Sequence, residues 1–136
     1  MTAAGREPAG GPETLPEDVR RFVLSAVPSV PYLEALLIFR STGAALSARA
    51  LAHRLYTSEE RAAQLVAELH AARLIAPAPD QVSFRYVPAS PEVSALVGRL
   101  ADCYATRLLD VTRLIHSNTE RKAQQFADAF RLRKDP

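Results

Sequence analysis

An arginine and a glutamine one helical turn apart have the clearest capacity for recognition chemistry in this chain. Arg61 and Gln64 lie in the segment 57–75, where apolar residues recur at helical spacing. A carboxamide can pair with the edge of adenine, and a guanidinium can bind guanine or a phosphate. If the apolar residues face a core, Gln64 lies on the opposite side of the helix and Arg61 on its flank. Arg61 and Gln64 are therefore candidates for base contacts.

Three further arginines, Arg49, Arg54 and Arg85, lie on either side of this segment and are candidates for phosphate contacts. Carboxylates are interspersed with them, including Glu59 and Glu60 at the start of the predicted helix. Residues 43–87 hold five arginines and four carboxylates, a net of one positive charge. Two interpretations stay open, namely phosphate binding and an ordinary surface of solvated arginines.

No arrangement of residues typical of a catalytic centre occurs, so we expect no enzymatic activity and no cofactor. The histidines His53, His70 and His116 form no pair on one helical turn, and no cluster of cysteines or carboxylates accompanies them. We therefore predict no metal site. The single cysteine, Cys103, excludes an intramolecular disulfide, and its simplest role is that of a small apolar residue. A redox sensor, the alternative, requires a lowered thiol pKa.

Prolines and apolar spacing predict the elements that position these side chains. A first helix starts near Pro16, and a second, over 32–41, is apolar around most of its circumference and should be buried. Gly43 follows, where a left-handed helix end is common. A short helix over 47–56, a tight polar turn over 57–60 and a second amphipathic helix within 61–75 have the spacing of two helices packed at a steep angle. Thr57 and Glu60 predict a capping box for the second of them.

The C-terminal half begins with two predicted strands, over 74–77 and 82–87, joined by a turn at 79–81. In the second strand Val82, Phe84 and Tyr86 alternate with polar residues. Ser90 and Pro91 begin a long helix that we expect to run unbroken to about residue 116. A second capping box, over 117–120, predicts a final helix.

The long helix carries an apolar stripe that exceeds what a small module covers alone. This length predicts that two chains pair along it about a two-fold axis. The alternative is that the stripe packs against the first two helices of the same chain and leaves a monomer. The predicted dimerisation residues are Val97, Leu100, Tyr104, Leu108, Val111 and Ile115.

The element order, with Leu51-Ala52-x-x-Leu55, Leu65-Val66-x-x-Leu69 and Leu74-Ile75, resembles the winged helix-turn-helix regulators of bacteria. It is most similar to the MarR-type family, from about residue 16 onwards. The resemblance implies a mainly α fold with a small β-hairpin wing, in which the second helix of the motif reads DNA and the terminal helices pair between subunits. This chain has Arg73 where the family often has glycine, and Val82 where its wing often has arginine.

These patterns together predict a flexible tail over residues 1–14 and one domain over 15–136. Within that domain we expect N-terminal helices over 15–42, the winged helix-turn-helix over 43–88 and C-terminal helices over 89–136. The 136 residues are 48% hydrophobic and 24% charged, as is ordinary for a soluble globular protein. No apolar run approaches the roughly 18 residues of a membrane span, and the first twelve residues hold no apolar stretch of a secretory signal. We therefore expect a cytoplasmic protein. The dominance of arginine over lysine is typical of a GC-rich bacterial genome.

Two functions remain open from the sequence. The first is a homodimeric transcriptional regulator that binds double-stranded DNA through Arg49, Arg54, Arg61, Gln64 and Arg85. The alternative is a winged-helix module that binds a protein partner and no DNA. The acidic start of the second helix and a wing without a basic tip favour the alternative.

Overall fold

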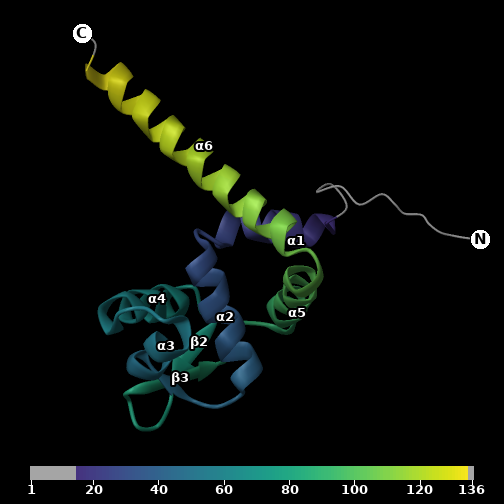
Figure 1. Ribbon diagram of the computed structural model, residues 1–136, viewed down its shortest axis with the longest axis vertical. Helices are drawn as coiled ribbons and strands as arrows, with labels where there is room; N and C mark the ends of the chain where they lie inside the picture. The colour runs from purple at the N-terminus through teal and green to yellow at the C-terminus, as the bar shows by residue number, and fades with distance from the viewer. Residues whose placement is uncertain (1–14, 135–136) are drawn as a thin grey trace, which may run out of the picture. The chain divides into compact units, whose positions relative to one another are not determined.

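The computed structural model describes the backbone of residues 15–134 and the side chains of residues 15–131; the tail predicted over 1–14 lies outside the described residues. Residues 15–134 form six helices and three short strands (Figure 1). This confirms a mainly helical fold with a small antiparallel β element. The chain divides into two compact units, one of residues 30–98 and one that joins the N-terminal segment up to Ser29 with the segment from Arg99 onwards.

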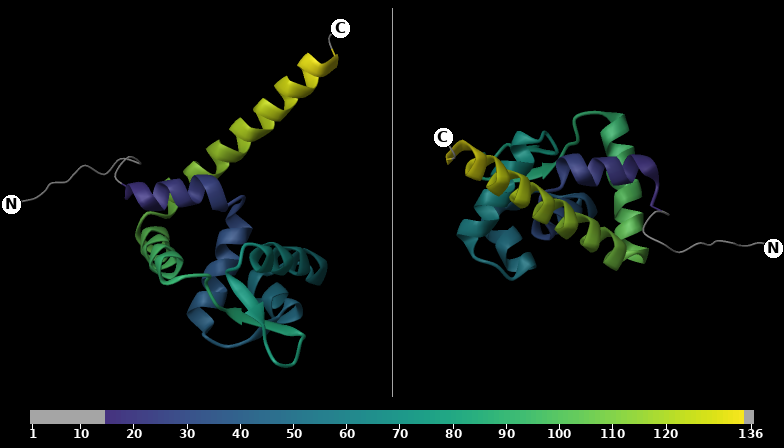
Figure 2. Two further views of the ribbon diagram at one scale, coloured as in Figure 1. Left: turned by 180° about the vertical axis from the view of Figure 1, so that it is seen from behind. Right: turned by 90° about the horizontal axis from the view of Figure 1, so that it is seen from above.

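The unit of residues 30–98 contains three helices, a small sheet and the start of a fourth helix. These are α2 (Val30–Thr42), β1 (Leu46–Ser47), α3 (Ala48–Leu55), α4 (Glu59–Ala71), β2 (Ile75–Pro77), β3 (Ser83–Tyr86) and the first turns of α5 (Pro91–Thr106). Helix α2 contacts α3, α4 and β3, and α3 packs against α4 (Figures 1 and 2). The core of this unit therefore surrounds α2.

Helix α2 is buried because apolar residues surround most of its circumference. Leu33, Leu36 and Phe39 are fully buried. The helix begins two residues before the predicted start, because Pro31 lies in the first turn, where the missing N–H has no helical partner to lose. It is followed by Gly43 at φ +66°, the left-handed residue that the sequence predicts.

The three strands form an antiparallel sheet in the order β1-β3-β2. Strand β2 pairs with β3 in the register Ile75 with Tyr86, and β1 pairs with β3 through Leu46 and Phe84. The predicted hairpin is therefore present, with shorter strands than expected. Val82 lies in the turn, 66% exposed, and not on the half-buried face of a strand.

The second unit is built from α1 (Glu17–Ala26), the later turns of α5 and α6 (Leu108–Lys134). Helix α1 packs against the first half of α6 (Figure 2). Val19 and Val23 of α1 and Ile115 of α6 are fully or almost fully buried.

The prediction of one unbroken helix from residue 91 to about 116 was wrong, because α5 ends at Thr106 and α6 begins at Leu108. Polar side chains at the break bond locally. The Thr106 hydroxyl donates to the carbonyl of Asp102 (3.0 Å), and the Arg107 guanidinium donates twice to the Asp110 carboxylate (3.0 and 2.7 Å). The Arg107–Asp110 pair joins the residue at the break to the first turn of α6.

The prediction of a new helix start at 117–120 was also wrong, because α6 runs through this segment to Lys134. The Thr119 hydroxyl donates to the carbonyl of Ile115 (3.0 Å) within the helix, and to that of Pro28 (3.1 Å). A hydroxyl that bonds back to the preceding turn is compatible with a continuous helix.

Among residues 15–134, no single helix is both long and apolar enough to cross a membrane. Helices α1 and α2 meet that length and composition only when taken together across the bend between them.

Candidate nucleic-acid interface

Helix α3 places two of the predicted phosphate-binding arginines side by side. The Ser47 hydroxyl caps the helix by accepting from the backbone N–H of Ala50 (3.1 Å), while Leu51 and Ala52 turn inwards and are buried. Arg49 and Arg54 are exposed on the outer side, where they line an open depression of about 450 Å³ together with His53 and Ala50. The structure therefore brings Arg49 and Arg54 together.

Helix α4 brings together the two predicted base-contacting residues. Nη1 of Arg61 lies 3.4 Å from Oε1 of Gln64, as expected for side chains three residues apart on a helix. Gln64 is exposed and Arg61 is half-buried. The opposite face of the helix, with Ala62, Leu65, Val66 and Leu69, is buried.

The start of α4 differs from the predicted capping box. Ser58, and not Thr57, is the N-terminal cap, because its hydroxyl accepts from the backbone N–H of Arg61 (3.0 Å). The N–H of Thr57 instead donates to the carbonyl of Ala52 (3.0 Å) and closes the preceding helix. Glu60 thus lies in the first turn of α4, exposed.

The hairpin carries Arg85 on β3, exposed and opposite Ala76 of β2. Its tip is organised by Asp80, whose carboxylate accepts from the backbone N–H groups of Val82 (2.9 Å) and Ser83 (2.8 Å) and from the Ser83 hydroxyl (2.9 Å). These bonds, of which the one from the Ser83 N–H contributes most, hold the pKa of Asp80 below its ordinary value. Arg85 does not line the depression that Arg49 and Arg54 share.

The arginines of this region have no carboxylate partner. In the part of the chain that the structure describes, Arg49, Arg54, Arg61 and Arg85 form no ion pair with a carboxylate. Elsewhere among the described residues Arg21, Arg99, Arg107 and Arg131 each pair with an aspartate or glutamate, whereas Arg20, Arg40 and Arg113 have no such pair. The guanidinium groups of the candidate interface are thus available to an external anion.

Tyr56, which the sequence reasoning did not single out, is the most exposed large apolar residue of this region. Its side chain is 97% exposed, and its backbone is left-handed with φ +56°. Arg73 also has a positive φ, of +64°, at the position where the MarR-type resemblance puts glycine. The only sequence signal for Tyr56 is its place at a helix end that lacks the usual glycine.

The predicted dimerisation residues are divided between two helices. Val97 and Leu100 of α5 and Val111 and Ile115 of α6 are buried within the single chain. Tyr104 is half-buried and Leu108 is 48% exposed. The pairing of two chains through this set stays a prediction, although four of its six members already have intramolecular cover.

The most exposed aromatic pair lies further along α6. Phe126 and Phe130 are 75% and 55% exposed, and their rings stack with centroids 6.4 Å apart. All side chains from Thr119 to Arg131 are exposed. This part of α6 therefore has an exposed apolar surface within the residues that the structure describes.

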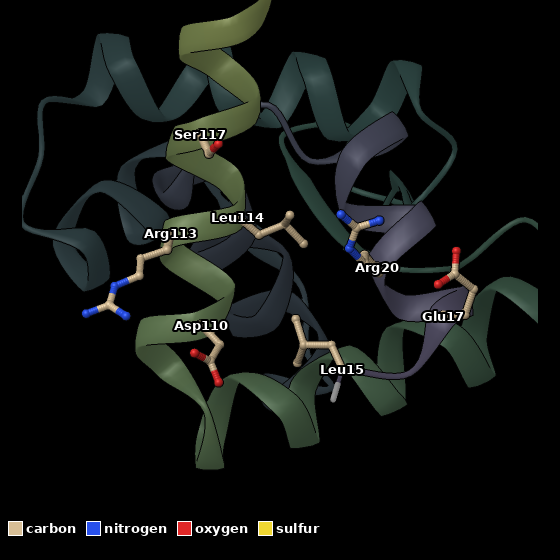
Figure 3. A pocket seen from close by; sticks show the side chains of 7 residues that line it. All are labelled: Leu15, Glu17, Arg20, Asp110, Arg113, Leu114 and Ser117. Atoms are coloured by element: carbon tan, nitrogen blue, oxygen red, sulfur yellow. The ribbon is translucent and has the colours of Figure 1, made fainter. Parts of the chain in front are cut away.

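A pocket of about 460 Å³ lies between α1 and α6, where Leu15 and Leu114 point towards one another (Figure 3). Two carboxylates and two guanidinium groups line it, so it selects neither anions nor cations by charge. The lining residues are Leu15, Glu17, Arg20, Asp110, Arg113, Leu114 and Ser117.

Neither metal binding nor thiol chemistry finds support at other residues. The described residues contain no group of three or more His, Cys, Asp or Glu that could hold a metal ion. Burial raises the pKa of the Cys103 thiol, and the effect of nearby Arg107 does not reverse it. A raised pKa disfavours the thiolate that a redox sensor needs.

Comparison of the chain with protein-family models, with curated proteins and with solved structures found no match.

Proposed function

We propose that this protein binds double-stranded DNA through residues 47–87 and acts as a transcriptional regulator with a winged helix-turn-helix similar to that of MarR-type regulators. The observation that carries the proposal is that none of the five arginines in this region has a carboxylate partner among the described residues; they are Arg49, Arg54, Arg61, Arg73 and Arg85. A guanidinium that is already paired must give up that pair before it binds a phosphate. Unpaired guanidinium groups bind one without this loss.

The arrangement of α3, α4 and the hairpin supports the same proposal. Two helices in contact, followed by an antiparallel hairpin, are the parts that a winged helix-turn-helix requires. In this proposal α4 enters the major groove, where Gln64 contacts adenine and Arg61 contacts guanine. Arg49 and Arg54 of α3 and Arg85 of the hairpin bind phosphates.

The proposal includes a homodimer in the cytoplasm, with a second copy of α6 on the exposed stripe. Ile115, Thr119, Ala123, Phe126 and Phe130 follow one another at steps of 4, 4, 3 and 4, the spacing of a helix-pairing seam. The ten residues of α1 extend about 15 Å and the 27 residues of α6 about 40 Å, so α1 cannot cover the full length of the seam. A second copy presents the same stripe and fits the uncovered half.

Sedimentation equilibrium tests the dimer. We expect the wild-type protein to be a dimer and the double variant Phe126→Ala and Phe130→Ala to be a monomer that melts cooperatively. The control variant Gln125→Ala, on the same helix, should remain a dimer. A monomeric wild-type protein would refute this part of the proposal.

Fluorescence anisotropy with a GC-rich duplex at several salt concentrations tests DNA binding. We expect the logarithm of the binding constant to fall linearly with the logarithm of the salt concentration. Arg54→Ala should reduce that slope by about one per copy, because one phosphate contact is lost. Arg113→Ala removes the same charge from α6, outside the interface, and should leave the slope unchanged. Absence of binding at low salt refutes the proposal.

A protein-binding module without DNA affinity is the second candidate, and two observations favour it. Glu59 and Glu60 are exposed at the start of α4, and the hairpin tip presents apolar Val82. The two carboxylates repel phosphate, and Val82 cannot bind it. Failure of the anisotropy experiment at low salt would make this candidate the preferred function.

A further inference from the structure

Tyr56 is an aromatic residue in a backbone conformation that favours glycine. It lies between α3 and α4 at φ +56° and ψ +46°. In this left-handed region the Cβ of an L-residue crowds the backbone, whereas glycine adopts the conformation without this crowding. Aspartate and asparagine are the usual exceptions, and tyrosine is not among them.

The conformation is required by the way α3 ends. The N–H of Tyr56 donates to the carbonyl of His53 (3.4 Å), and the N–H of Thr57 donates to that of Ala52 (3.0 Å). This pair of bonds closes a helix around one left-handed residue. The residue at that position is therefore left-handed whatever its side chain.

The Tyr56 ring does not contribute to the packing of the fold. The side chain is 97% exposed, and no hydrogen bond or ring contact of it occurs within residues 15–134. Helix α2, by comparison, is followed by Gly43 at φ +66°. Arg73 (φ +64°) and Gln81 (φ +60°) share the left-handed conformation, so what distinguishes Tyr56 is an almost fully exposed aromatic ring at such a position. The fold does not use this ring, which leaves it available to a contact outside the chain.

We infer that Tyr56 contacts the DNA backbone: its hydroxyl donates a hydrogen bond to a phosphate oxygen, and its ring lies against the adjoining deoxyribose. The inference rests on the proposed DNA binding. Tyr56 lies between Arg54 and Arg61 along the chain, two of the unpaired arginines of the candidate interface. A tyrosine hydroxyl is a common donor to phosphate, and as a neutral group it fixes the distance and orientation of the duplex.

The inference predicts opposite effects of one substitution on stability and on binding. Replacement by glycine removes the backbone strain and should stabilise the fold, although the unfolded chain gains flexibility. The same replacement removes the phosphate contact. If Tyr56 made no contact with DNA, its replacement by glycine would raise stability without weakening DNA binding.

Thermal melting and anisotropy titration of the full chain test this with three variants. Tyr56→Gly should raise the melting temperature by about 2 to 4 °C and weaken binding to the GC-rich duplex about tenfold. Tyr56→Phe keeps the ring, so it should melt like the wild type and bind about three- to fivefold more weakly. The slope of binding against salt should not change in either variant, because no charge is lost.

Arg73→Gly is the matched control for stability. Arg73 ends α4 through the same pair of bonds, from its N–H to His70 (2.9 Å) and from that of Leu74 to Leu69 (3.1 Å), at φ +64°. Its replacement should raise the melting temperature by a similar amount.

Wild-type affinity in Tyr56→Gly would overturn the inference and leave the proposed function in place. Wild-type affinity in Tyr56→Phe would refute the hydrogen bond to phosphate. If the wild-type protein itself shows no salt-dependent binding, the proposed function fails, and the inference fails with it.

Discussion

Asn118 is the one buried polar side chain among residues 15–131, and we predict that it fastens α6 to the end of α1. Its side chain is 5% exposed, and its Nδ2 donates to the carbonyl of Leu24 (3.0 Å). The helical partner of that carbonyl is the N–H four residues on, but residue 28 is a proline and has none. Asn118 therefore supplies the hydrogen bond that the sequence of α1 cannot.

We expect Asn118→Ala to lower the free energy of unfolding by about 2 kcal/mol. An unsatisfied buried carbonyl costs about 1–3 kcal/mol, and the Leu24 carbonyl is only partly buried, which favours the lower half of that range. The small cavity left by the amide adds to this value. The second bond, from Arg121 to Oδ1 of Asn118 (2.9 Å), adds little, because Arg121 is exposed and can turn to water.

Urea denaturation followed by circular dichroism measures this change. Asn118→Leu restores the volume without the donor, so it should also destabilise, by about 1 kcal/mol or more. Gln125→Ala, an exposed position on the same helix, should stay within about 0.5 kcal/mol of the wild type. If both Asn118 variants also stayed within that range, the Leu24 carbonyl would have another partner and the argument would be wrong.

Three further predictions concern the candidate interface. Replacing Arg61 and Gln64 together by alanine should relax sequence preference by about 1–3 kcal/mol per lost base contact, measured by selection from random duplexes; unchanged preference contradicts their role. Hydrogen bonds from Ser83 and Val82 lower the pKa of Asp80. The ionised Asp80 carboxylate therefore stabilises the hairpin fully above the ordinary pKa of 3.8, and this stabilisation disappears as the pH falls through the lowered pKa. An NMR titration of the Asp80 carboxylate that gives 3.8 or more would exclude this. Ser58→Ala should lower the free energy of unfolding by about 1 kcal/mol in thermal melts, more than Thr57→Ala does. A larger loss in Thr57→Ala would show that Thr57 is the cap, as the capping box predicts.

The start of α4 shows what the sequence could predict and what it could not. Apolar spacing predicts the helix and its buried face, and a hydroxyl before an acidic first turn predicts a cap. Thr57 and Ser58 have the same capping chemistry, however. The choice depends on the left-handed residue Tyr56, which commits the N–H of Thr57 to the end of α3 and leaves Ser58 to begin α4. Residue preferences alone do not reveal that conformation.

The sequence likewise predicts one part of the candidate site and not the other. The proximity of Arg61 and Gln64 could be predicted, because residues three apart on a helix are neighbours. The absence of carboxylate partners at these arginines could not, because an ion pair can also join residues distant in the chain, as Arg99 pairs with Asp18. An apolar stripe likewise does not reveal whether its cover comes from the same chain. Val97, Leu100, Val111 and Ile115 have that cover, and Phe126 does not.

The weak charge of the interface makes the second copy a requirement of the DNA-binding proposal. Three phosphate contacts from Arg49, Arg54 and Arg85 correspond to a salt slope of about −3 for one copy and about −6 for two. Residues 43–87 carry a net of only one positive charge, so long-range attraction adds little to these contacts. Joining two modules makes the second binding event intramolecular and raises affinity without any new contact. Under the proposed function, the stripe of α6 and the arginines of α3 and β3 would act in one mechanism, and the salt slope would count how many copies are bound.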